Sequence, residues 1–226
     1  MTETTNNTDS QLIINYTEES VIKKTVQLQI DSIKSIATEG DIIFRGGTDI
    51  ESNIIRDFSN TGKLFSHCGI LLKNRGKLVV THILGGTTNP DGSILSQPLE
   101  DFLSYPDNES AGVYAVKLSE KQLYKLYHFI DSAQKQRVTF DLHFNLFTKQ
   151  QLYCTELLID ALSFARGKKN LYYPTSFNLK NTKYFFLNND GDYFSFYPVD
   201  KFQHHQSLNL KAVFRFPNYQ PGTVTR

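Results

Sequence analysis

Helical and strand-like periods of apolar residues alternate along the chain, which predicts a mixed α+β protein. Apolar residues recur at steps of three and four over residues 22–37, and Gly40 follows this pattern as a helix stop signal. The next apolar run, residues 41–45, is typical of a short strand. Residues 1–16 are polar, so we expect a flexible tail followed by a single domain over residues 17–226.

The clearest local prediction is a β-hairpin. Residues 66–72 form one strand, an Asn-Arg-Gly sequence at residues 74–76 forms the turn, and residues 77–84 form the returning strand. Because side chains alternate along a strand, His67 and Cys68 must point to opposite faces of the sheet. If His67 belongs to a functional site, Cys68 is therefore a packing residue.

Capping residues and apolar stripes predict the other helices. Thr48 with Glu51 and Ser119 with Gln122 have the spacing of capping boxes at helix starts. Another helical stripe begins at Cys154 and ends at the next glycine.

The remaining elements are predicted from weaker sequence patterns. Pro98 opens a short helix that ends near Leu103, and residues 140–151 form an aromatic and polar connector. Residues 193–197 and 210–216 are predicted to be late strands that complete the sheet.

Composition excludes several classes of protein. The chain has 226 residues, of which 39% are hydrophobic and 21% charged, and its net charge is +1. These values are typical of a globular protein and give no electrostatic basis for binding nucleic acid. No apolar run approaches the ~18 residues of a membrane span, and the polar N-terminus does not resemble a signal peptide. We therefore expect a cytoplasmic protein, or a secreted effector exported without a cleavable signal peptide.

Two cysteines are too few for a disulfide scaffold or a zinc ribbon, although the sequence leaves a bond between Cys68 and Cys154 open. No spacing of histidine, cysteine and carboxylate residues matches a metal site. The glycine-rich segment at residues 85–93 lacks the ending of a phosphate-binding loop. We expect no metal and no organic cofactor.

Cys154 and His67 are the residues best suited to catalysis. Cys154 lies in the first turn of its predicted helix, where free N–H groups and the helix dipole favour a thiolate and offer a donor to an oxyanion. A strand histidine such as His67 can take the thiol proton as a general base. Each residue also has an ordinary explanation, as a buried structural cysteine and a packing histidine.

A third polar group should orient the imidazole of His67. His82 is the first choice because it lies on the returning strand of the same hairpin. Asp141, in the connector before Cys154, is the second choice, although a turn or cap aspartate is its ordinary explanation. Glu156 is expected to be a first-turn acid that suits the helix dipole.

Several sequence strings occur in an order that resembles a known family. They are Gly-Asp-Ile-Ile-Phe-Arg at residues 40–45, Ser-His-Cys-Gly-Ile at 66–70, Pro-Leu-Glu-Asp-Phe-Leu at 98–103, Phe-Asp at 140–141 and Tyr-Cys-Thr-Glu-Leu at 153–157. Together they resemble the circularly permuted NlpC/P60 papain-like proteins of the YiiX/YaeF type, from about Gly40 to Gly167.

The resemblance implies a permuted papain-like α+β fold in which an antiparallel sheet packs against the cysteine-bearing helix, here with an extra N-terminal helix. The permutation places the histidine strand ahead of the cysteine helix, with Cys154 as nucleophile and His67 as base. The family usually carries a glutamate on the returning strand where this chain has His82, so the third position departs from the family pattern.

These observations predict a thiol hydrolase that cleaves an amide bond, with a cell-wall peptide as candidate substrate, through an acyl-enzyme. Aromatic residues are numerous after residue 170 and would also suit a lipid-directed acyl hydrolase or acyltransferase. The departure at His82 would suit a catalytically inactive binding module on the same fold. The expected partner is an amide- or acyl-bearing substrate, peptide or lipid.

Overall fold

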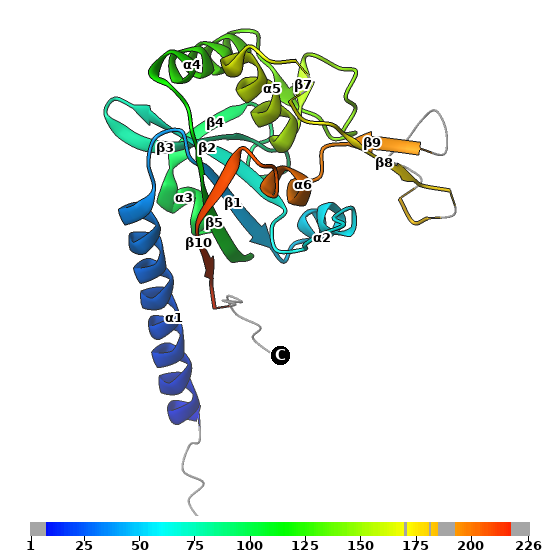
Figure 1. Ribbon diagram of the computed structural model, residues 1–226. Helices are drawn as coiled ribbons and strands as arrows, with labels where there is room; N and C mark the ends of the chain where they lie inside the picture. Colours follow the sequence, from blue (N-terminus) through cyan, green and yellow to red (C-terminus); the bar gives the residue numbers. More distant parts are fainter. Residues whose placement is uncertain (1–7, 170, 181, 185–192, 218–226) are drawn as a thin grey trace, which may run out of the picture.

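A six-stranded antiparallel sheet forms the centre of the protein (Figure 1). The computed structural model describes residues 8–169, 171–180, 182–184 and 193–217, and in the first helix it describes side chains from residue 20 onward. The strands of the sheet are β1 (Ile42–Gly47), β2 (His67–Asn74), β3 (Lys77–Ile83), β4 (Ile94–Pro98), β5 (Asn108–Val116) and β10 (Leu208–Arg215). Their order across the sheet is β10-β5-β1-β2-β3-β4.

The remaining elements surround this sheet. The helices are α1 (Thr8–Ile36), α2 (Ile50–Asp57), α3 (Leu99–Leu103), α4 (Glu120–Lys135), α5 (Cys154–Arg166) and α6 (Val199–Gln203). Two short strand pairs lie outside the sheet, and they are β6 (Thr139–Phe140) with β7 (Gln151–Leu152) and β8 (Thr175–Asn178) with β9 (Tyr193–Phe196).

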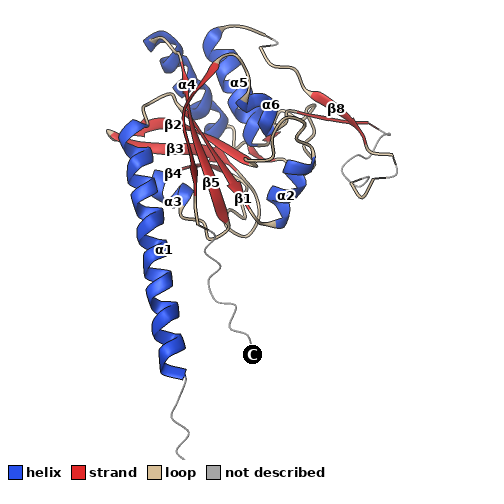
Figure 2. Cartoon of the chain, turned by 60° about the horizontal axis from the view of Figure 1, so that its bottom comes forward, coloured by secondary structure: helices blue, strands red, loops and turns tan. Residues whose placement is uncertain are grey.

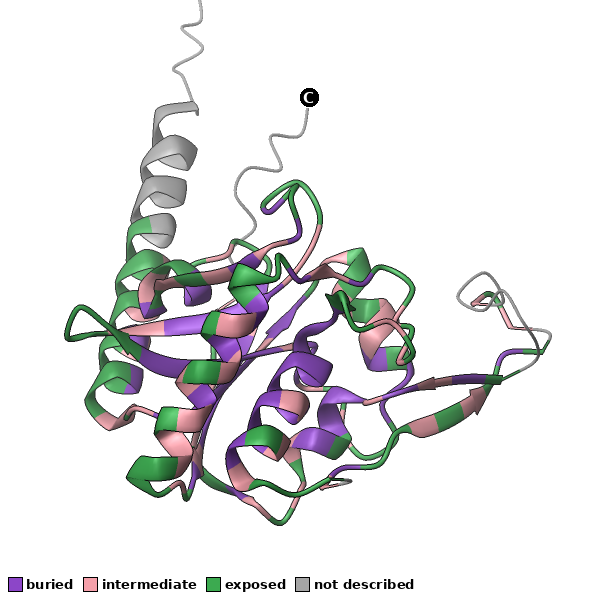
Figure 3. Cartoon of the chain, turned by 90° about the horizontal axis from the view of Figure 1, so that it is seen from above, coloured by how far each residue is buried: buried purple, intermediate pink, exposed green. Residues whose placement is uncertain are grey.

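Helices cover both faces of the sheet (Figure 2). On one face, α1 and α3 contribute Ile33 and Phe102 to a buried cluster that includes Leu71 of β2. On the other face, α4, α5 and α6 pack over a second cluster that includes Cys68 of β2 and Leu158 of α5. Because α5 lies against the sheet, it is buried along most of its length, as Figure 3 shows. Burial of these two apolar faces is the main driving force for the fold.

The predicted hairpin is confirmed, and it sets the positions of the histidines. β2 and β3 are antiparallel, and the turn between them places Arg75 and Gly76 at positive φ. Leu71 lies on the α1 and α3 face, whereas Cys68 lies on the α5 face, so the predicted alternation along β2 also holds. β1 pairs with the other side of β2 and brings Arg45 directly opposite His67.

The predicted ends of two helices are confirmed as well. α4 starts with the capping box of Ser119 and Gln122. α5 begins at Cys154 and stops at Gly167, whose φ of +64° is the left-handed conformation that glycine adopts without strain.

Two predicted segments differ in the structure. Residues 193–197 were expected in the main sheet, but β9 pairs with β8, and its Phe194 and Phe196 pack on Phe58 of α2. The N-cap of α2 is Asp49 instead of Thr48, because the Asp49 carboxylate accepts the backbone N–H of Ser52 at 2.7 Å.

The first helix starts earlier than expected. α1 begins at Thr8, inside the segment predicted to be a tail over residues 1–16, and no glycine or proline interrupts the chain from there to Ile36. Residues 1–7 of that predicted tail lie outside the described residues. Neither α1 nor any other helix in the described ranges is long and apolar enough to cross a membrane.

Gly69 allows β2 and β3 to approach closely beside the histidines. A Cβ added at Gly69 would lie 2.5 Å from Cγ1 of Val80 and 3.1 Å from Cβ of His82. We predict that Gly69→Ala lowers the free energy of unfolding by about 1–3 kcal/mol, because one strand must shift to relieve the overlap. Urea denaturation measures the effect. Gly62→Ala is the control, since its Cβ would meet only Nε2 of His204, at 3.9 Å; equal stability of the two variants would contradict the prediction.

Candidate active site

Cys154 is the first residue of α5, as predicted, and its neighbours hold it in place. The N-cap residue Tyr153 has extended backbone, and its hydroxyl accepts the backbone N–H of Tyr197 at 2.7 Å. Thr155 donates its hydroxyl to the carbonyl oxygen of Tyr197 at 2.7 Å. Residues on both sides of Cys154 are therefore tied to the same point of the chain, which fixes the start of α5 next to the sheet.

The surroundings of Cys154 favour its thiolate. The thiol of Cys68 hydrogen-bonds the Cys154 sulfur and is the largest cause that lowers the pKa of Cys154. Burial acts in the opposite direction, and the backbone N–H groups of Cys68, Thr155 and Cys154 lower the pKa further. Burial raises the pKa of Cys68 well above its usual value, so Cys68 stays protonated and can donate. Both cysteines are free thiols.

The two histidines of the hairpin form a hydrogen-bonded pair. Nε2 of His67 lies 2.9 Å from Nδ1 of His82, and their rings meet edge to face with centroids 5.1 Å apart. The ring of Phe102 from α3 contacts both imidazoles. Among the described residues this is the only hydrogen bond to the His67 ring, so its Nδ1 is available to another group.

Both imidazoles are held in the neutral state. Burial lowers the pKa of His67 well below its usual value, and the nearby charge of Arg45 lowers it further. The same two causes lower the pKa of His82 to about 3. A neutral imidazole at neutral pH is what a general base requires.

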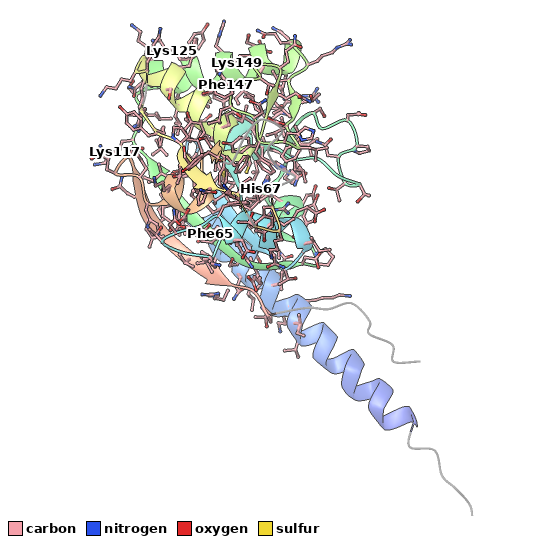
Figure 4. The ribbon with its side chains drawn as sticks, turned by 90° about the vertical axis from the view of Figure 1, so that its right-hand side faces the viewer. Phe65, His67, Lys117, Lys125, Phe147 and Lys149 are labelled. Atoms are coloured by element: carbon pink, nitrogen blue, oxygen red, sulfur yellow. The ribbon has the colours of Figure 1, made fainter. Side chains whose placement is uncertain are left out.

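The structure brings the histidines together and the cysteines together, but on different faces of the sheet. His67 and His82 lie on the α3 face, whereas Cys68 and Cys154 lie on the α5 face. No contact among the described residues joins the Cys154 sulfur to the His67 ring. Figure 4 shows His67 within the body of the protein, near Phe65. The contact between nucleophile and base stays a prediction.

The other candidates have structural roles. Asp141 is buried, and its carboxylate accepts the backbone N–H groups of His143 at 2.8 Å and Asn145 at 2.5 Å, so it holds its own loop. Glu156 is 2% exposed, and burial together with the charge of Asp160 raises its pKa to about 8. Glu156 is therefore mostly protonated at neutral pH, which corrects its expected role as a charged helix acid.

Sequence reasoning missed Arg45 and the role of Cys68. Arg45 is the one charged residue of β1, and its place in an apolar strand was the available signal. The contact between Cys68 and Cys154 depends on how α5 docks, so no local pattern could have indicated it. Among the described residues, no group of three or more histidine, cysteine or carboxylate side chains is arranged to hold a metal ion.

Comparison with known proteins supports the fold alone. No family model matches the sequence, and no curated protein matches it. Among solved structures, the chain is similar to the crystal structure of metalloprotein YiiX from Escherichia coli O157:H7, of the DUF1105 group. The TM-score is 0.59 and the identity 18%, over 77% of this chain and 96% of that chain. The protein is thus a mixed α/β protein with a mostly antiparallel sheet and a YiiX-like arrangement.

The contact between the two thiols predicts a measurable change of pKa. Cys68→Ala should raise the pKa of Cys154, because it removes the side chain that most favours the thiolate. The rate of alkylation by iodoacetamide as a function of pH measures this pKa. Cys68→Ser keeps a hydroxyl donor and should stay closer to the wild-type protein. Identical profiles for Cys68→Ala and the wild-type protein would contradict the assignment.

The buried carboxyl of Glu156 predicts a pH-dependent stability. Between about pH 4.5 and 8 the unfolded chain has released the Glu156 proton while the folded protein keeps it, so the free energy of unfolding falls as the pH rises. Glu156→Gln, which mimics the protonated acid, should flatten this slope in urea denaturation. Glu120→Gln at the exposed start of α4 removes the same charge as a control. An unchanged slope in Glu156→Gln would refute the assignment.

Proposed function

We propose that the protein is a cysteine hydrolase of the permuted papain-like type, and that it cleaves an amide bond. The single observation that carries the proposal is the position of Cys154 as the first residue of α5, where backbone N–H groups favour its thiolate. A buried structural cysteine has its pKa raised, as Cys68 does. The neutral pair of His67 and His82 on the neighbouring strands, and the likeness of the fold to YiiX, support the same assignment.

The proposed reaction proceeds through an acyl-enzyme. The Cys154 thiolate attacks the carbonyl carbon while backbone N–H groups at the start of α5 stabilise the oxyanion. The His67 imidazole receives the thiol proton and delivers it to the leaving amine, and the C–N bond breaks. Water, deprotonated by His67, then hydrolyses the thioester and releases the carboxylic acid. His82 orients His67 through its hydrogen bond to Nε2.

This mechanism sets a geometric requirement. Nδ1 of His67 must come within hydrogen-bonding reach of the Cys154 sulfur. His67 is the first residue of β2, so its side chain lies where the strand begins. Cys154 accepts the backbone N–H of Cys68, which is the next residue. The two groups thus approach the same peptide unit, and a rotation of the His67 side chain past the start of the strand would join them.

Two of the aromatic residues after residue 170 do not support the lipid alternative. Phe194 and Phe196 are buried and pack with Phe58 and Tyr153 in an aromatic cluster, so they serve as core. Residues 185 and 186, part of the same aromatic stretch, lie outside the described residues. A peptide amide, such as a cell-wall peptide, is the substrate class that we propose.

We predict that Cys154→Ala and His67→Ala each abolish turnover while the fold stays intact. The loss for His67→Ala should be about 10²–10⁴-fold, the usual contribution of a general base. Intact-mass spectrometry with p-nitrophenyl acetate detects an acetyl group on the nucleophile, and circular dichroism checks the fold. Cys68→Ala removes the other thiol and should still form the adduct, more slowly at neutral pH because the pKa of Cys154 rises. Acetylation of Cys154→Ala at the wild-type rate would refute the role of Cys154.

Product analysis separates the substrate classes. Mass spectrometry of a peptidoglycan digest should show new amine and carboxylate ends if the protein is an amidase. Free fatty acid or exchanged acyl chains from lipid extracts would favour the lipid enzyme instead. A Cys154 thiol with the ordinary pKa of about 8.5 and no acetyl adduct would favour a non-catalytic binding module.

A further inference from the structure

Arg45 lies beside the histidine pair in a fixed position. Direct pairing of β1 with β2 places Arg45 opposite His67, and paired residues of neighbouring strands share a face of the sheet. The charge of Arg45 reaches both imidazoles, and the Cys154 thiolate in turn raises the pKa of Arg45. The guanidinium is therefore within electrostatic reach of each proposed catalytic group.

Aromatic rings hold the guanidinium rigidly. Its central carbon lies 4.1 Å from the centroid of the Tyr105 ring and 4.8 Å from that of Phe102. Nη1 donates a hydrogen bond to the carbonyl oxygen of Phe102 at 3.0 Å. A planar donor held in this way is preorganised for a flat or tetrahedral oxyanion.

No acidic partner neutralises this cation. Among the described residues, none of the ion pairs involves Arg45, whereas Arg56, which is buried, pairs with Glu109. Asp49 is the acidic residue whose charge reaches Arg45, but its carboxylate oxygens are engaged by the backbone N–H and the hydroxyl of Ser52. A partly buried cation without a counter-ion is costly unless a ligand supplies the negative charge.

The remaining donors of Arg45 are open. Arg45 and His67 are both partly exposed, and neither contributes a buried nitrogen without a partner. Nη1 bonds Phe102 and a further hydrogen bond joins the guanidinium to the Tyr105 side chain, and a guanidinium carries more N–H donors than these contacts use.

We propose that Arg45 forms an oxyanion-binding subsite next to His67, so that the substrate carries a carboxylate or phosphate group close to the bond that is cleaved. This inference rests on the proposed hydrolase function. Arg45 binds the anionic group as a specificity-determining residue and takes no part in the bond-breaking steps. A substrate without a negative charge near the scissile bond leaves the guanidinium unpaired and binds less well.

Two alkylating reagents that differ in charge test the subsite. Iodoacetate carries a carboxylate and iodoacetamide does not, so the ratio of their rates at Cys154 reports a nearby cation, whatever fraction of the thiol is ionised. Arg45→Gln should lower this ratio roughly fivefold, because the attraction between opposite charges is lost. Arg45→Lys keeps the positive charge but loses the planar guanidinium with its several N–H donors. Its ratio of rates should therefore lie between those of the wild-type protein and Arg45→Gln. Arg75→Gln, at the exposed tip of the β2–β3 hairpin, removes the same charge and should leave the ratio unchanged.

The outcomes separate this inference from the proposed function. An unchanged ratio in Arg45→Gln, with Cys154 still reactive, overturns the subsite and leaves the hydrolase proposal standing. If Arg45→Gln does not fold, the wild-type protein provides the test. Inorganic phosphate should then slow its reaction with iodoacetate and leave the rate of its reaction with iodoacetamide unchanged. Equal slowing of both reactions, or of neither, overturns the subsite.

Failure of Cys154 to react with either reagent would count against the proposed function. In that case the binding of anions to the protein tests the subsite by itself. Titration of Cys154→Ala with inorganic phosphate or acetate should shift the NMR signals of the His67 imidazole in a saturable way. The additional change Arg45→Gln should abolish the shift. Stronger binding of phosphate indicates a phosphate-bearing substrate, and stronger binding of acetate indicates a carboxylate. No saturable shift with either anion overturns the inference.

Discussion

The alternation of side chains along β2 is the constraint on which the candidate site depends. His67 faces α3 together with His82 and Arg45, whereas the next residue, Cys68, faces α5 and contacts Cys154. One peptide unit therefore joins the imidazole half of the site to the thiol half. The proposed catalysis requires these halves to meet at the start of the strand.

The same burial acts in opposite directions on the groups of the two halves. It lowers the pKa of His67 and raises that of Cys68, so both are neutral. The pKa of Cys154 is lowered in spite of burial, because the Cys68 thiol and the N–H groups at the start of α5 stabilise its negative charge. Arg45 adds a positive charge that keeps the histidines neutral, and the proposed site thus combines a thiol whose ionisation is favoured with an unprotonated base that can receive its proton.

Local signals predicted the elements of the site, but long-range packing decided how they meet. The hairpin, the capping box at Ser119 and the helix from Cys154 to Gly167 follow from residues close in sequence. The pairing of β9 with β8 could not be predicted, because an alternating aromatic strand fits several partners equally well. The protonated state of Glu156 could not be predicted from the sequence either, because it depends on burial by the surrounding structure.

A crystal structure of the protein acylated at Cys154 would test the central claim most directly. The account predicts that Nδ1 of His67 lies roughly 3–3.5 Å from the Cys154 sulfur or the water that attacks the thioester. A His67 ring that remains behind β2, separated from the acylated cysteine by the strand, would contradict it.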